Sequence, residues 1–196
     1  MAFEIDLLPV GSKKKSGDCI AMRYGDLKNG GQDQTVIVID GGYGCTWEDT
    51  LKPHLQKYYN CEYDGKLHID LVILSHPDQD HVSGLVEMAN DGDVEIACVM
   101  MHKPWEELPP SWFKDGRITK ESLKDKLGDA FEKAKELDDA TKTVATAHLE
   151  LGTYVLNNAH ITILGPSPSF YKTCIANCEK TPGQDDKVKN LPQSLA

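Results

Sequence analysis

The sequence lacks any apolar run long enough to cross a membrane, since its longest apolar runs have only the length of β-strands. It also lacks a secretory signal, because residues 1–6 offer neither a basic start nor an apolar core. These absences predict a cytoplasmic protein, or one whose signal has been removed, and we expect no membrane partner.

An excess of basic residues is missing too, because the formal net charge at pH 7 is −10. Proteins that bind nucleic acid nonspecifically rely on Lys and Arg against phosphate, so this charge disfavours such binding. The one basic cluster, Lys13-Lys14-Lys15, lies in a Gly/Ser-flanked loop and is best explained as solvated surface. A nucleic-acid substrate held locally stays open, because a bound metal ion supplies its own positive charge.

The six cysteines follow no zinc-ribbon spacing. Cys19 and Cys98 lie in apolar runs, where a free thiol behaves as a small hydrophobic group. Cys174 and Cys178 are close enough in sequence to share a helix face, but we interpret them as ordinary thiols rather than a pair or metal ligands. This usage fits a reducing compartment.

What is present has the composition of a soluble globular domain, with 196 residues, 40% of them hydrophobic and 27% charged. We predict one domain over residues 1–175, followed by a polar tail or linker over residues 176–196. Periodicity and turn residues predict helices over residues 46–59, 82–90 and 119–139. They predict strands over residues 3–10, 19–24, 35–40, 68–74 and 94–101, and a hairpin over residues 154–164. Strands that come first and then alternate with helices indicate a mixed sheet faced by helices, an α/β class.

One short segment concentrates the ligand chemistry of the chain. His76, Asp78, Asp80 and His81 fall directly after the apolar strand predicted at residues 68–74. Buried or clustered charges are costly unless they are paired or bound to a metal ion. A strand that delivers two imidazoles and two carboxylates into one turn, with a helix from Val82, therefore predicts a metal site rather than a solvated polar turn.

The segment His76-Pro77-Asp78-Gln79-Asp80-His81 resembles the signature loop of the metallo-β-lactamase superfamily, which usually reads His-x-His-x-Asp-His. With the Gly84-Leu85 that follows, it looks most like the branch that contains the hydrolase domain of ComEC-type competence proteins. Residues 36–42 resemble the strand and Asp-Gly-Gly turn before that loop, and residues 16–20 resemble the Gly-Asp segment that opens the second strand. The resemblance implies an αββα sandwich, of which this chain would be the N-terminal half or a reduced version.

The same resemblance implies roles for the four residues. His76 and Asp78 would bind one metal ion, and Asp80 and His81 would bind a second. Asp80 would also hold the attacking water, which makes it the candidate general base. Asp40, at the end of a neighbouring strand, is predicted to orient a ligand histidine from behind, a role compatible with capping the turn that follows it.

Asp78 stands where the superfamily usually has a second histidine, and this departure bears on the metal. Carboxylate-rich sites suit manganese or magnesium, whereas nitrogen-rich sites suit zinc. We therefore expect a divalent metal, manganese before zinc, in a site of one or two ions. The same departure argues against β-lactamase activity itself.

The downstream histidines that the superfamily uses are not evident. His102 follows the strand predicted at residues 94–101, and two interpretations stay open: a ligand near the mouth of the site, or a packing residue beside Pro104 and Trp105. His148 and His160 lie in no supporting motif. The chain is therefore interpreted as a fragment or as a member whose second half comes from another chain.

Two functions follow from these observations. The first is a metal-dependent hydrolase that uses a metal-activated water on a phosphodiester or nucleotide substrate. The second is a catalytically incomplete metal-binding or interaction module that needs a partner segment. A redox di-iron site would need more ligands than the sequence offers. Because the predicted strands are apolar on both faces, we also expect self-association or a bound C-terminal segment.

Overall fold

The structure is a computed structural model that describes residues 2–11, 16–27, 33–112, 119–142, 144–148, 151–178 and 181. The chain forms two compact units. The first contains Met1–His102 and Glu136–His148, and the second contains Lys103–Lys135 and Leu149–Ala196.

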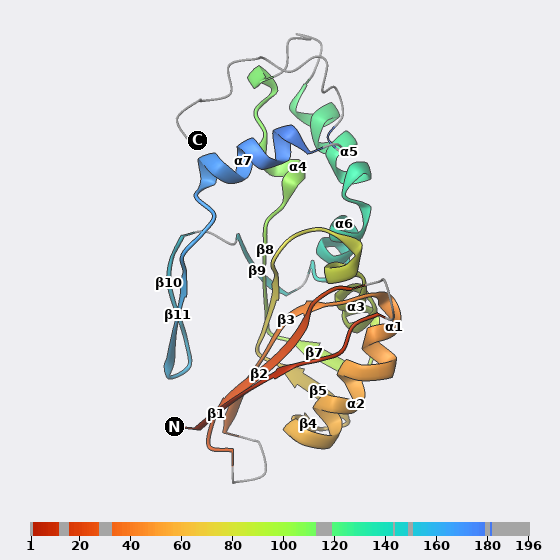
Figure 1. Ribbon diagram of the computed structural model, residues 1–196, viewed down its shortest axis with the longest axis vertical. Helices are drawn as coiled ribbons and strands as arrows, with labels where there is room; N and C mark the ends of the chain where they lie inside the picture. Colours follow the sequence, from red (N-terminus) through yellow and green to blue (C-terminus); the bar gives the residue numbers. More distant parts are fainter. Residues whose placement is uncertain are drawn as a thin grey trace. The chain divides into compact units, whose positions relative to one another are not determined.

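A six-stranded mixed sheet forms the centre of the first unit (Figure 1). In spatial order its strands are β1 (Ala2–Leu7), β2 (Cys19–Gly25), β3 (Gln34–Gly41), β6 (Leu71–Leu74), β8 (Cys98–Met101) and β9 (Ala145–His148). The first three run antiparallel, whereas β3, β6, β8 and β9 are parallel neighbours. Parallel strands end at the same edge of a sheet, so the residues that follow β3, β6 and β8 meet there.

The central strands are apolar because both of their faces are covered. Val38 and Val72 are fully buried partners in the β3–β6 ladder, and all four residues of β6 are buried. The predicted strands over residues 19–24 and 35–40 are confirmed; β2 is one residue longer at its end, and β3 is one residue longer at both ends.

Two predicted strands are each divided in the structure. Residues 68–74 supply β6 and the end of β5 (Lys66–Ile69), and residues 94–101 supply β7 (Val94–Ile96) and β8. β5 and β7 join β4 (Glu62–Tyr63) in a separate three-stranded sheet. Asp70 marks one division, because its carboxylate accepts a hydrogen bond from the Val36 amide at 2.7 Å in place of a ladder partner.

Two helical stretches of the first unit follow β3 and β6 in the sequence. One helical stretch runs through α1 (Gly44–Thr46), a π-helical turn (Trp47–Leu51), α2 (Lys52–His54) and a second π-helical turn (Leu55–Tyr59). This stretch begins at Gly44, before the predicted start at Thr46. Pro53 lies in α2, between the two π-helical turns, where the regular pattern of helical hydrogen bonds is interrupted. The other helix is α3 (Gln79–Asn90), which contacts β3.

The second unit contains α4 (Pro104–Glu107), a 3₁₀ turn (Pro110–Trp112), α5 (Lys120–Ala130), the hairpin β10 (Gly152–Leu156) and β11 (Ala159–Ile163), and α7 (Pro168–Asn177). The hairpin is confirmed, with Asn157 in the left-handed region that its tight turn requires.

The predicted helix over residues 119–139 is divided in the structure, because Phe131 leaves helical geometry between α5 and α6 (Glu132–Ala140). The predicted tail begins within the last turn of α7, and residues 179–180 and 182–196 lie outside the described part of the chain.

The edge strand β1 carries apolar side chains on one face. Phe3, Ile5 and Leu7 alternate along the strand and are 71%, 53% and 78% exposed. Contiguous exposed apolar surface is a common feature of interaction sites. Among the described residues, no helix combines the length and apolar character needed to span a membrane.

Candidate metal centre

The start of α3 is held against the end of β3 by a contact between backbones. The Gly84 amide donates to the Gly42 carbonyl at 3.0 Å. A Cβ atom on Gly84 would lie 1.9 Å from the Gly41 carbonyl oxygen, so only glycine permits this approach. The contact brings the first turn of α3 next to the residue that precedes Gly41, which is Asp40.

The helix begins three residues earlier than the sequence predicted, at Gln79 rather than Val82. Asp78 occupies the N-cap position, with the extended backbone typical of a cap, and its carbonyl accepts from the His81 and Val82 amides. Its carboxylate makes no side-chain capping bond. Asp80 and His81 therefore lie in the first helical turn, not in the tight turn that we predicted.

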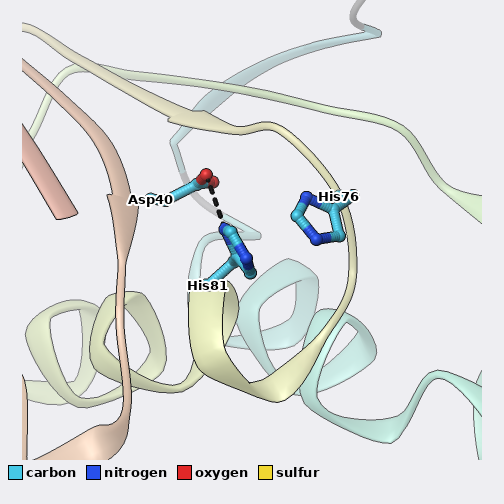
Figure 2. A group of neighbouring side chains, drawn as sticks. All are labelled: Asp40, His76 and His81. Atoms are coloured by element: carbon cyan, nitrogen blue, oxygen red, sulfur yellow. Dashed lines mark hydrogen bonds and ion pairs between the residues drawn. The ribbon is translucent and has the colours of Figure 1, made fainter. Parts of the chain in front are cut away.

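The motif side chains face one another in pairs. His76 Nε2 lies 3.7 Å from Asp78 Oδ2, and His81 Nε2 lies 3.8 Å from Asp80 Oδ2. The two imidazole rings are 3.8 Å apart between centroids and tilted by 51°. Figure 2 shows His76 on the loop after β6 opposite His81 on α3. His76 and Asp78 are exposed and His81 is buried, so the group is open to solvent on the His76 side.

Asp40 lies behind His81 and is almost fully buried, with a side-chain exposure of 4%. Its Oδ2 is 2.9 Å from His81 Nδ1, the contact drawn in Figure 2. Its Oδ1 accepts from the Ser75 amide at 2.8 Å, and its Oδ2 lies 2.5 Å from Ser75 Oγ. The backbone φ of Asp40 is +55°, a conformation that costs energy in residues other than glycine and that is concentrated at functional sites.

The donor set fits a divalent cation. One metal ion holds its ligand atoms at about 2.0–2.2 Å, so two ligands of one ion lie no more than about 4.4 Å apart. The two His–Asp pairs, at 3.7 Å and 3.8 Å, both satisfy this limit without movement of the backbone. Within the described residues, the ligand atoms of Asp40, His76 and His81 also lie within 4.8 Å of one another.

The sequence profile of the Metallo-beta-lactamase superfamily matches residues 30–169, a range that contains these residues. The chain belongs to this superfamily. Similar solved structures include that of "hydrolase AbOPH in beta lactamase superfamily", with 19% identity and a TM-score of 0.35 over 72% of this chain and 48% of that one. They also include AidC, a dizinc quorum-quenching lactonase solved with the product N-hexnoyl-L-homoserine, with 18% identity and a TM-score of 0.36 over 72% of this chain and 45% of that one. The chain spans about half the length of either structure, and no curated protein matches it.

The resemblance implies further ligands downstream, and the sequence leaves His102 open as either a ligand or a packing residue. The residue follows β8, whose Met101 pairs with Leu74 of β6, and it is buried with 8% exposure. It is not part of the ligand group that the described residues form. His148 ends the next strand, β9, opposite Met101, but its side chain lies outside the described part of the structure.

Asp18 approaches the site although it was not among the predicted ligands. Its Oδ2 lies 3.8 Å from His81 Nδ1, and its side chain is 68% exposed. The preceding Gly17 packs so closely on the motif that an added Cβ would lie 2.2 Å from the Asp80 carbonyl oxygen. The available signal was the Gly17-Asp18 dipeptide at the start of β2, which the resemblance contained without assigning it a role.

Burial makes the thiol of Cys19, at this edge of the sheet, unreactive. Cys19 pairs with Gly41 across the β2–β3 ladder, and burial, together with the charge of Asp40, raises the pKa of its thiol to about 12. Reactive cysteines have lowered rather than raised pKa values. All six cysteines are free thiols.

Proposed function

We propose that this chain is a metal-dependent hydrolase of phosphodiester or nucleotide substrates. The observation that carries the proposal is the pairing of His76 Nε2 with Asp78 and of His81 Nε2 with Asp80 at distances that ligands of a single cation can have. The superfamily assignment supports hydrolysis, and the substrate class rests on the chemistry of the donor set.

His76, Asp78, Asp80 and His81 would hold the ion or ions. A divalent cation, when bound, lowers the pKa of a water molecule so that it becomes a nucleophile near neutral pH. Asp80 is positioned to orient the attacking water and to accept its proton, since its carboxylate is a third exposed in the first turn of α3. Asp40 is hydrogen-bonded to protein groups through both oxygens, so its part is to orient His81.

The choice of metal and substrate follows from Asp78. A carboxylate in place of the usual second imidazole gives two oxygen and two nitrogen donors, which favours manganese over zinc. Oxygen-rich sites of this type suit phosphate esters, which is why the ComEC-type branch is the part of the superfamily that we propose. The net charge of −10 favours a small nucleotide, or a nucleic-acid end held only at the site, over a long nucleic acid.

Hydrolysis of bis(p-nitrophenyl) phosphate by the metal-stripped chain tests the proposal, after addition of manganese or of zinc. We expect metal-dependent turnover that Asp80→Asn reduces by about 10²–10⁴-fold, the range of general-base contributions. Glu87→Gln removes an exposed carboxylate of the same helix and should leave turnover unchanged. A lactone and a β-lactam serve as competing substrate classes, and preferential hydrolysis of either would refute the phosphodiester assignment.

One observation favours a second candidate function. In the part of the chain that the structure describes, no histidine downstream of His81 joins the ligand group. The alternative is therefore a metal-binding module that becomes active only with a partner segment. Stoichiometric manganese or zinc binding without turnover of any of the three substrate classes would support this alternative over the hydrolase.

A further inference from the structure

Ser75 contacts both sides of the metal centre. It follows β6 directly, and its amide donates to Asp40 Oδ1 at 2.8 Å. Its hydroxyl oxygen lies 2.5 Å from Asp40 Oδ2 and 2.9 Å from His76 Nδ1. A single hydroxyl therefore connects the buried carboxylate to a histidine on the exposed side of the site.

The proton positions follow from the chemistry of the partners. The carboxylate of Asp40 accepts the Ser75 amide proton at Oδ1 and the Ser75 hydroxyl proton at Oδ2. The single Ser75 hydroxyl proton must then point to Asp40, which leaves Ser75 Oγ as an acceptor. The 2.9 Å contact with His76 consequently needs a proton on Nδ1 of that imidazole.

The same reasoning applies to the second histidine. His81 Nδ1 lies 2.9 Å from Asp40 Oδ2, so His81 also carries its proton on Nδ1. Both rings are then left with an unprotonated Nε2, the atom that faces Asp78 in one case and Asp80 in the other. A metal ligand needs that free lone pair, and the hydrogen bond at the other nitrogen sets which atom offers it.

We propose that Ser75 is a positioning residue that extends the orienting effect of Asp40 from His81 to His76, so that one carboxylate sets the tautomer of both histidines. The inference deepens the proposed function and rests on it for the identity of what Nε2 binds. It also assigns Asp40 a place behind the ligands rather than among them, although its oxygens are close enough to share an ion with the histidines. Three hydrogen bonds and 4% exposure leave Asp40 poorly placed for direct ligation.

We call the connection from Asp40 through the Ser75 hydroxyl to His76 the relay. Nuclear magnetic resonance of the metal-free chain labelled with ¹⁵N-histidine tests the relay directly. Two-bond ¹H–¹⁵N correlations, at a pH where imidazole is neutral, distinguish a ring protonated on Nδ1 from one protonated on Nε2. We expect the Nδ1–H form for His76 and His81 in the wild type. In Ser75→Ala, His76 should change to the Nε2–H form that a free imidazole prefers, whereas His81 should keep its pattern.

Metal affinity gives the second measurement, by competition of the chain with a chromophoric chelator for zinc and for manganese. Ser75→Ala should weaken binding by about 10–100-fold, the usual effect of losing a partner behind a ligand. Ser75→Thr retains the hydroxyl and should restore both the tautomer and the affinity. Ser83→Ala is the matched control, because Ser83 lies on α3 and makes no hydrogen bond to the site in the described structure.

The outcomes separate the relay from the proposed function. A His76 ring with its proton on Nε2 in the wild type would overturn the relay, and this result needs no variant that must fold. An unchanged His76 tautomer or unchanged affinity in folded Ser75→Ala would overturn it too. If the tautomers are as expected but the wild type binds neither metal, the relay stands and the proposed function fails.

Discussion

Replacement of Gly84 by alanine should disrupt the metal centre indirectly, because it disturbs the contact that holds α3 against β3. A Cβ atom at this position would lie 1.9 Å from the Gly41 carbonyl oxygen and 2.8 Å from its carbonyl carbon. Both atoms belong to backbone and have no rotamer that relieves the overlap. The first turn of α3 must therefore move away from β3 by roughly 1 Å or more to reach ordinary van der Waals distance.

The expected cost combines two opposing effects. Alanine in a helix interior is normally favoured over glycine by about 1 kcal/mol. Overpacking of a tight contact costs about 1–3 kcal/mol, and the overlap here is with backbone, which places the cost at the upper end. We expect Gly84→Ala to lower the free energy of unfolding by about 2 kcal/mol and to weaken metal binding, because His81 moves with the helix away from Asp40.

Urea unfolding followed by circular dichroism measures the first effect, and chelator competition measures the second. Gly128→Ala is the matched control, since Gly128 lies inside α5 and an added Cβ would meet only the Lys135 side chain at 3.8 Å. That variant should be neutral or stabilising by up to about 1 kcal/mol. If Gly84→Ala is no less stable than Gly128→Ala, the reasoning from the close approach is wrong.

Three other perturbations test separate parts of the description. Asp78→His should shift the metal preference from manganese towards zinc in parallel titrations, and an unchanged preference would mean that Asp78 is not a ligand. Burial raises the thiol pKa of Cys19 to about 12 and that of Cys61 to about 11. At pH 8 a thiol reagent should therefore modify the exposed Cys45 and Cys174 quickly, and it should modify Cys19 and Cys61 only after unfolding. Sedimentation at micromolar concentration should show self-association that Ile5→Lys with Leu7→Lys reduces, because these side chains are exposed on edge strand β1; a monomeric wild type would refute that proposal.

The sequence predicted the central strands well because burial on both faces leaves an unbroken apolar run, as in residues 36–39. It could not predict where such a run changes sheets. Asp70 looks like one polar residue inside a strand, and only its hydrogen bond to the Val36 amide, 34 residues earlier, reveals the division. Contacts between distant residues leave no local periodicity.

The site shows the same limit. The residue types and spacing of the motif predicted a metal site, and the structure brings His76 close to Asp78 and His81 close to Asp80. The start of α3 was misplaced because Asp78 was interpreted only as a ligand, whereas it also occupies the N-cap position. Ser75 was overlooked because its importance depends on three partner atoms that the fold brings together.

The parallel pairing of β3 with β6 has a consequence for how the centre assembles in time. Bringing Ser75 to Asp40 closes a loop of 35 residues, an entropic cost of about 3 kcal/mol before the constant term. Once Val38 and Val72 are paired, that cost has been met, and the contacts of Asp40 with the Ser75 hydroxyl and with His81 need little further ordering. The two histidines thus become oriented when β3 and β6 pair. The centre is therefore misaligned for as long as the β3–β6 ladder is unpaired. Exchange of the Ser75 amide proton reports the free energy of opening that ladder.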